Sequence, residues 1–413
     1  MNMRPVPSTL QTLTRALNTG GRVLQGAAST PLVRLDAALF LEEARRRVRL
    51  EDFGDLPLRE PLERLIAAYE HDAGLTLIGR IAARQDTIRL LANRLRMQAD
   101  RRRHPEIEAE GIRRPLFVTG LPRTGTTLLH GLLAQDPVAR APLHWGCVFP
   151  SPPPDRVRYA SDRRIGVAAR QLRWFHRLNP EIRKIHAVAA QLPEECLIVT
   201  SHSFLSFQFQ TSHHVSSYQT WLEAQDLRPA YAEHRRFLQH LQWRCHGAHW
   251  VLKAPAHLYG IDALFAAYPD AGVILTHREP LEVVASAASL HTVLRSTFSD
   301  TVDPVAVGRE VTHRWAEGMR RALAARDGGC APAERFLDVH YADLVRDPIG
   351  VVRRIYTHFD LPYSPAADAR MRAFLAEHPK DKHGRHEYTL EQFGLDRDVE
   401  RRRYAWYRER FGL

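Results

Sequence analysis

The spacing of apolar residues predicts a helical beginning to this chain of 413 residues. Between about Leu35 and Arg103, apolar side chains recur every three or four residues, as they do along one face of a helix. Such a set is formed by Leu62, Leu65, Ile66 and Tyr69, and another by the apolar residues of 75–97. We therefore expect residues 1–112 to form an N-terminal helical segment that packs on the domain after it.

From Pro115 the pattern changes to short apolar runs, most of which are followed by a turn and a helical pattern. The runs that predict strands are 116–119, 250–252, 272–276 and 336–339. The helical patterns that follow the first, third and fourth runs are 126–133, 280–290 and 345–359. Strands that alternate with helices predict a mostly parallel sheet covered by helices on both faces. The expected fold is a three-layer αβα fold over residues 113–413, preceded by the helical layer.

Composition and charge narrow the classes of partner and the cellular location. Lys and Arg (58) outnumber Asp and Glu (47), and the net charge of +11 favours anionic partners such as nucleic acid, a membrane surface or a phosphorylated small molecule. The four cysteines form no CxxC pair, which favours a reducing compartment, and we predict the cytoplasm. No apolar run reaches about 18 residues and no signal-peptide core is visible, so no membrane span is expected.

A glycine-rich turn follows the first predicted strand. Gly120 and Gly125 are separated by four residues, as in a Walker A loop, and such a loop can direct backbone N–H groups and a helix N-terminus at a phosphate. Thr126, however, stands where a nucleoside triphosphatase has its lysine, and the cation inside the loop is Arg123. The loop is therefore suited to hold a phosphate and poorly suited to metal-assisted ATP chemistry.

The segment from Pro115 to Pro137 resembles the 5′-phosphosulfate loop of sulfotransferases, in the longer G-L-P-R-T-G-T-T form of a bacterial family. The resemblance implies a P-loop-type fold and the donor 3′-phosphoadenosine-5′-phosphosulfate (PAPS), whose product is 3′-phosphoadenosine-5′-phosphate (PAP). It implies that the 5′-phosphosulfate is bound by Arg123, Thr124, Gly125, Thr126 and Thr127. Arg123 is also expected to act in catalysis, near the bridging oxygen.

A second anion site is predicted at the end of the third strand. Arg278 ends that strand and Ser286 lies two turns into the next helix, so both can reach one phosphate. The spacing resembles the 3′-phosphate motif R-x-P-x(5)-S of sulfotransferases. By the same resemblance Tyr341, in Y-x-D-L-x-x-D-P, is expected near the adenine. A basic loop of Lys382, His383, Gly384 and Arg385 is expected to close over the 3′-phosphate.

The catalytic candidates follow the second strand. Lys253 ends the strand and His257 comes one turn later, in a segment that resembles the family's L-K-S-P-x-H-L with Ala254 in place of the serine. This implies that Lys253 stabilises charge on the leaving group and that His257 is the general base, because a neutral imidazole is available near pH 7. A carboxylate base from Glu194 or Glu195 is the alternative, and the sequence leaves this choice open.

The resemblance predicts a PAPS-dependent sulfotransferase that acts on a hydroxyl, less readily an amine, of a small-molecule, lipid or glycan acceptor. No metal is required for this chemistry. The aromatic residues Phe204, Phe207, Phe209, Tyr218 and Trp221 could line the acceptor pocket or simply form core. A nucleotide kinase or NTPase and a basic nucleic-acid-binding protein are the alternatives, although no recognised nucleic-acid motif is present. Peripheral membrane contact and the oligomeric state stay open.

Overall fold

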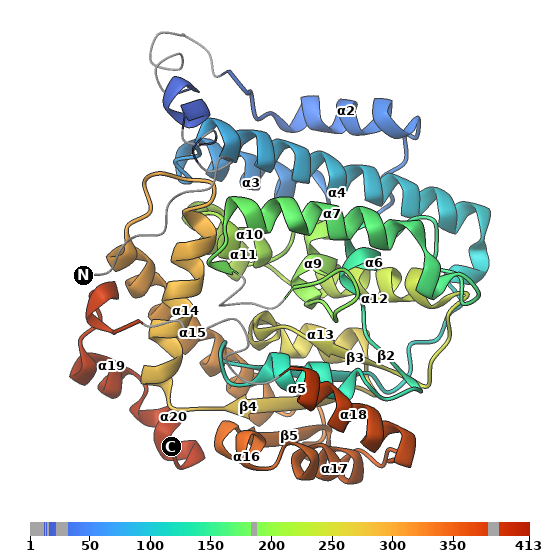
Figure 1. The fold of residues 1–413 in the computed structure, drawn as a ribbon, viewed down its shortest axis with the longest axis vertical. Helices are drawn as coiled ribbons and strands as arrows, with labels where there is room; N and C mark the ends of the chain where they lie inside the picture. The colour runs from blue at the N-terminus through green and yellow to red at the C-terminus, as the bar shows by residue number, and fades with distance from the viewer. Residues whose placement is uncertain (1–11, 13, 15, 22–31, 183–187, 379–387) are drawn as a thin grey trace.

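A parallel sheet lies in the lower half of the molecule as viewed in Figure 1, with helices above and below it. The computed structural model describes residues 12, 14, 16–21, 32–182, 188–378 and 388–413. Five strands pair in the order β2-β3-β1-β4-β5, and every described pairing is parallel. The strands are β1 Leu116–Gly120, β2 Ala139–Arg140, β3 His249–Lys253, β4 Gly272–His277 and β5 Phe336–His340.

Helices cover both faces of the sheet, which makes the fold a three-layer α/β fold. On one face Val118 and Val251 pack with residues of α5 (Thr126–Leu133), α17 (Pro348–His358) and α18 (Pro365–Glu377). On the other face Phe117 and Leu252 pack with residues of α12 (Arg228–Gln242), α13 (Ile261–Ala267), α14 (Pro280–Arg295) and α15 (Pro304–Asp327). Side chains alternate along a strand, so neighbouring residues of β1 and β3 serve opposite cores.

The N-terminal helices belong to the second of these cores. They are α2 (Ala37–Val48), α3 (Arg59–His71) and α4 (Leu77–Arg103). Leu62, Leu65 and Leu91 are fully buried in the same apolar cluster as Phe117 of the sheet. The helical layer is thus packed directly on the α/β core, while a domain boundary at residue 112 stays a prediction. No helix in the described ranges is long and apolar enough to cross a membrane.

The predicted strands and the helix over 126–133 are confirmed, and two other elements differ from the prediction. The predicted helix over 345–359 is two helices, α16 (Tyr341–Arg346) and α17. Asp347, between them, has φ −143° and ψ 80°, because the residue before Pro348 is disfavoured in a helix. The two-residue strand β2 was missed, since so short an edge strand leaves no alternating pattern to detect.

The remaining helices connect these layers and carry part of the site. Between β2 and β3 they are α6 (His144–Val148), α7 (Arg163–Leu178), α9 (Cys196–Thr200), α10 (Gln208–Ser212) and α11 (Ser216–Glu223). At the C-terminus they are α19 (Arg397–Arg403) and α20 (Ala405–Phe411). Short 3-10 turns link several of them, including residues 255–259 directly after β3.

Candidate active site

The carboxyl ends of four parallel strands bring the predicted site segments to one edge of the sheet. The loop 121–125 follows β1, Lys253 ends β3, Arg278 follows β4 and Tyr341 follows β5. The chain passes from β3 on one side of β1 to β4 on the other. Ligands of open parallel sheets bind at such an edge, where the strand order reverses.

The loop after β1 is shaped by residues with positive φ. Gly120 has φ 144° and lies so close to β4 that a Cβ there would be 2.5 Å from the carbonyl oxygen of Thr276. Gly125, with φ 87°, is the N-cap of α5, and a Cβ would be 2.7 Å from Cδ2 of Leu344. Arg123 also has a positive φ, 66°. The loop is therefore tightly curled between its two glycines.

Thr124 holds this loop from inside. Its hydroxyl donates to the carbonyl oxygen of Leu121 at 2.6 Å and lies 2.6 Å from the hydroxyl of Thr276 on β4. The side chain is fully buried, as is most of Thr126, whereas Thr127 is exposed. The hydroxyl of Thr124 thus shapes the loop, and Thr127 is the hydroxyl residue on its open side.

The two predicted anion sites meet at Arg123. Its Nε donates to the hydroxyl of buried Ser286 at 3.0 Å, and its carbonyl oxygen accepts from Nη1 of Arg278 at 2.9 Å. The Arg278 guanidinium lies 4.2 Å from the centre of the Tyr341 ring. Burial, and to a smaller degree nearby Arg278, lowers the pKa of Arg123 below its ordinary value. Residues from three separate loops therefore form one cationic surface.

Arg278 also pairs with a carboxylate in the first turn of the helix that follows it, α14. Its Nε and Nη2 donate to Oε2 of Glu282 at 2.9 Å and 2.7 Å. The Glu282 side chain is 58% exposed, so the pair is screened by solvent and weak. A phosphate that binds Arg278 would compete with this pair at small cost.

Lys253 lies between the loop and the segment with the two adjacent acids. Its ammonium donates to Glu195 in a close ion pair and to Oγ1 of Thr127 at 3.3 Å. The Lys253 side chain is nearly fully buried. Glu194 turns elsewhere: its Oε2 lies 2.5 Å from Nδ1 of His144, and its Oε1 accepts from the backbone N–H of Glu195 at 2.9 Å. Of the two acids, Glu195 faces the lysine and Glu194 supports the turn.

His257 lies on the other side of the sheet from the Lys253 ammonium. Its ring packs edge-on against Phe117 at 5.0 Å, and its Nδ1 lies 2.7 Å from the Tyr231 hydroxyl. Its Nε2 has no hydrogen-bond partner among the described residues. Burial holds the pKa of His257 well below its ordinary value, so the imidazole is neutral.

A small, largely apolar cavity of about 20 Å³ lies beside His257. Its walls include Cys196 and Ala254, next to Glu195 and Lys253 in the chain, and His257 with Tyr231. Phe207 is the one residue of the predicted aromatic stretch that lines it; Phe204, Phe209 and Tyr218 are buried core, and Trp221 packs against them. His144 and Tyr231, which position Glu194 and His257, were missed because each lies far away in the sequence and belongs to no motif.

The basic loop of Lys382, His383, Gly384 and Arg385 lies outside the described residues. Its predicted contact with the 3′-phosphate stays a prediction.

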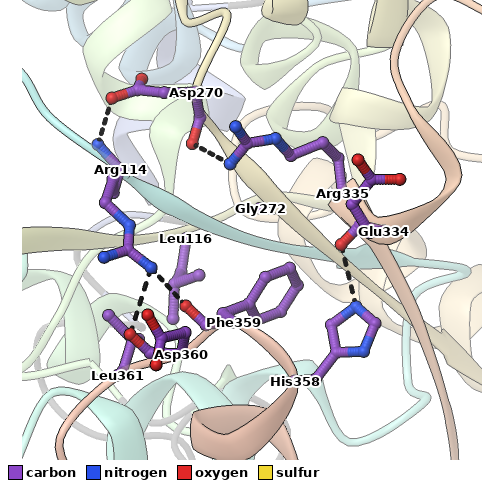
Figure 2. A pocket seen from close by; sticks show the side chains of 10 residues that line it. All are labelled: Arg114, Leu116, Asp270, Gly272, Glu334, Arg335, His358, Phe359, Asp360 and Leu361. Carbon is purple, nitrogen blue, oxygen red and sulfur yellow. Dashed lines mark hydrogen bonds between the residues drawn. The ribbon is translucent and has the colours of Figure 1, made fainter.

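A larger cavity, of about 260 Å³, lies at the opposite edge of the sheet, before β1, β4 and β5. Its cations are already bonded to their surroundings (Figure 2): Arg114 donates to the carbonyl oxygens of Phe359 and Asp360, and Arg335 to that of Asp270. His358 is likewise bonded to the Glu334 carbonyl oxygen at 3.0 Å. This cavity is remote from the strand ends that carry the site.

A three-layer α/β fold whose strand ends present a curled glycine loop, two arginines and a buried lysine is typical of the class of α/β enzymes that bind anionic ligands at a topological switch point. Comparison with known families makes the class specific. The family model described as "Sulfotransferase family" matches residues 115–365. The chain therefore belongs to the sulfotransferase family and is a sulfotransferase.

Relatives support the assignment along most of the chain. The crystal structure of sulfotransferase STF1 from Mycobacterium tuberculosis H37Rv is 35% identical, with a TM-score of 0.80 over 90% of this chain and all of that one. STF9 from Mycobacterium avium is 31% identical, with a TM-score of 0.84 over 93% of this chain and 99% of its own. The omega-hydroxy-beta-dihydromenaquinone-9 sulfotransferase Stf3 of Mycobacterium bovis is 27% identical over 297 residues, 67% of this chain and 71% of Stf3.

Proposed function

We propose that this sulfotransferase moves the sulfuryl group of PAPS to a hydroxyl of an apolar, lipid-like acceptor. The observation that carries the proposal is the meeting of the two predicted anion sites, through the hydrogen bonds of Arg123 with Ser286 and Arg278. PAPS has a charged group at each end of its ribose, and this surface offers guanidinium and hydroxyl donors from two loops. Sulfotransferases generally use this donor, which supports the same choice.

Each part of the surface then has a partner in the donor. Arg123, Thr126 and Thr127, with the loop backbone around Thr124 and Gly125, would hold the 5′-phosphosulfate. Arg278 and Ser286 would hold the 3′-phosphate, because a guanidinium and a hydroxyl together satisfy several phosphate oxygens. The Tyr341 ring, which packs on Arg278, would border the adenine.

Lys253 is proposed to stabilise the leaving phosphate. In the transfer, the acceptor oxygen bonds to sulfur while the bond from sulfur to the 5′-phosphate oxygen breaks, and PAP leaves with the extra charge. The ammonium of Lys253 already contacts Thr127 at the start of α5, beside the loop. A positioned cation at a developing charge contributes about 3 kcal/mol to the barrier reduction.

Glu195 is the base that the geometry favours. The sequence favoured His257, with Glu194 as a further catalytic candidate. Glu195 faces Lys253, whereas Glu194 is occupied by His144 and a backbone N–H. When Lys253 turns toward the leaving phosphate, the Glu195 carboxylate is released to accept the acceptor proton. His257 would then border the acceptor, with its Nε2 available for a hydrogen bond, and Glu194 would position Glu195.

The acceptor is inferred to be apolar from the cavity and from one relative. Leu197, Leu205, Phe207 and Leu227 line the small cavity beside His257, and such walls favour hydrocarbon. Stf3 is named for a menaquinone derivative with a terminal hydroxyl. The four cysteines are free, which fits the predicted cytoplasmic location.

Calorimetric titration with PAP, beside 5′-AMP and Mg²⁺–ATP, tests the donor. We expect tight binding of PAP and much weaker binding of 5′-AMP, because only PAP has the 3′-phosphate. Binding of Mg²⁺–ATP without binding of PAP would reject the proposal and favour a nucleotide kinase or NTPase. Transfer of labelled sulfate from PAPS to hydroxylated quinols, sterols and sugars then tests the acceptor class.

A further inference from the structure

Helix α7 is an exposed helix whose surroundings leave most of it uncovered. Of its 16 residues only Ala168 is fully buried. Figure 1 shows α7 on the near side of the molecule, between α4 and the sheet in this view. Its first turn packs near α6, and Asn179, just after its end, donates to the carbonyl oxygen of Val293 at 2.9 Å. Both ends are thus anchored while the outer face is free for a partner.

The outer face of α7 is strongly basic. The helix contains five arginines and no acidic residue. Arg163, Arg170, Arg173 and Arg177 are exposed, and their spacing of seven, three and four residues places them along one side of the helix. The fifth, Arg164, turns inward to Asp162. The exposed arginines therefore form a row of positive charge about four turns long.

These arginines differ from several arginines of other exposed helices, which have acidic partners one turn away. Arg47 pairs with Glu43, Arg59 with Glu63, and Arg372 with Asp368. Within the described part of the chain, Arg163, Arg170 and Arg173 form no salt bridge. A row of unpaired guanidinium groups retains its full attraction for an external anion.

Two exposed apolar side chains belong to α7 and to the segment before it. The Trp174 side chain lies in the basic row and is 56% exposed, with the Arg177 guanidinium 5.4 Å from the ring centre. Val157, in the segment that leads to α7, is 91% exposed. Tryptophan is favoured at membrane–water interfaces, where its apolar ring and its N–H are both accommodated.

We propose that α7, with Val157, docks this enzyme on a membrane surface that contains anionic lipids. The arginines would bind headgroup phosphates, and Trp174 and Val157 would enter the interface between headgroups and hydrocarbon. An exposed valine and tryptophan favour a lipid surface over nucleic acid, whose backbone offers no hydrocarbon. The α6 residue His144, next to α7, contacts Glu194 of the proposed catalytic segment, so docking at α7 holds that segment close to the lipid.

Flotation of the full chain with vesicles tests the proposal. Vesicles of phosphatidylcholine are compared with vesicles that also contain phosphatidylglycerol, at low and high salt. We expect binding to the anionic vesicles alone, weakened by salt. The triple variant Arg170→Gln/Arg173→Gln/Arg177→Gln should bind about a hundredfold more weakly, since each arginine near an anionic surface contributes about a fivefold gain. Trp174→Ala should weaken binding at both salt concentrations, because its contribution is apolar.

A matched variant distinguishes the effect of the α7 arginines from the effect of net charge alone. Arg397→Gln/Arg401→Gln/Arg402→Gln removes the same charge from exposed positions of α19 and should retain most of the binding. Equal losses in the two triple variants, or equal binding to neutral vesicles, would overturn the proposal. So would an α7 triple variant that loses affinity for duplex DNA while the unchanged protein ignores vesicles. PAP binding by each variant verifies that the donor site is intact, so loss of docking and failure of the proposed donor are distinguished.

Discussion

Replacement of Arg278 by alanine tests the assignment of the 3′-phosphate. The guanidinium would donate charge-assisted hydrogen bonds to that phosphate, worth about 1.5–3 kcal/mol. Its present pair with Glu282 is solvent-screened, and such a pair contributes about 0.5 kcal/mol, so exchange of partner subtracts little. Arg278→Ala should therefore weaken PAP binding by about ten- to a hundredfold.

The comparison with 5′-AMP makes the result specific. This ligand lacks the 3′-phosphate, so its affinity should change little in Arg278→Ala. Glu282→Gln removes the competing carboxylate. It should strengthen PAP binding by about twofold, because the ion pair of Arg278 with Glu282 no longer has to be broken. Both variants are titrated by calorimetry with PAP and with 5′-AMP at one salt concentration, because the interaction is electrostatic.

Arg278 also stabilises the loop that contains Arg123, so the stability of Arg278→Ala must be measured as a control. Its bond to the Arg123 carbonyl oxygen and its contact with the Tyr341 ring together contribute about 1–2.5 kcal/mol to stability. Thermal unfolding of Arg278→Ala shows whether the fold persists. Equal loss of affinity for PAP and 5′-AMP in a folded variant would refute the assignment, since Arg278 would then act only by shaping the loop. Unchanged PAP affinity would refute it outright.

Three further predictions concern the loop, the base and pH. Gly125→Ala places a Cβ 2.7 Å from Cδ2 of Leu344 at φ 87°, and should cost about 2–4 kcal/mol of unfolding free energy in denaturant titration. Gly166 lies on exposed α7, where an added Cβ would have no atom within 4 Å, so Gly166→Ala should raise the unfolding free energy by about 0.5–1 kcal/mol. Equal changes in stability in the two variants would contradict the loop geometry. Glu195→Gln should lower the rate of sulfuryl transfer by about 10²- to 10⁴-fold, with His257→Asn changing mainly KM for the acceptor; the reverse result would restore His257 as base. Burial, followed by Arg89, lowers the pKa of His202 to about 3, so the unfolded state binds its proton first as pH falls below about 6.5. Because of His202, the unfolding free energy should fall by up to about 1.4 kcal/mol for each pH unit between about pH 6 and pH 4. His202→Gln should reduce the slope of unfolding free energy against pH by that amount. An unchanged slope would show that His202 is accessible to protons in the folded state.

The sequence predicted the edge of the sheet well because the information there is local. A strand run followed by a turn fixes where a loop begins, and parallel strands bring such loops together, so Gly120, Lys253, Arg278 and Tyr341 are found at one edge. The pair of Arg278, which lies just before α14, with Glu282 in the first turn of that helix likewise joins residues that are close in the sequence. What depends on neighbours in the chain could be predicted in this way.

The direction of a side chain could not be predicted where the chain leaves regular structure. His257 is four residues from Lys253, yet the 3-10 turn at 255–259 directs its ring to Phe117, on the face of the sheet away from the Lys253 ammonium. A helical or extended continuation would have placed the two side chains differently, and no residue type in the segment distinguishes these cases. The partner of Lys253, Glu195, comes from a segment 58 residues earlier, and only the tertiary fold brings this N-cap residue of α9 to the end of β3. The choice of base therefore changed with the structure because it depends on which side of one strand a residue faces. Prediction of the donor site, in contrast, requires only that the end of each strand be located, and local sequence patterns indicate those ends.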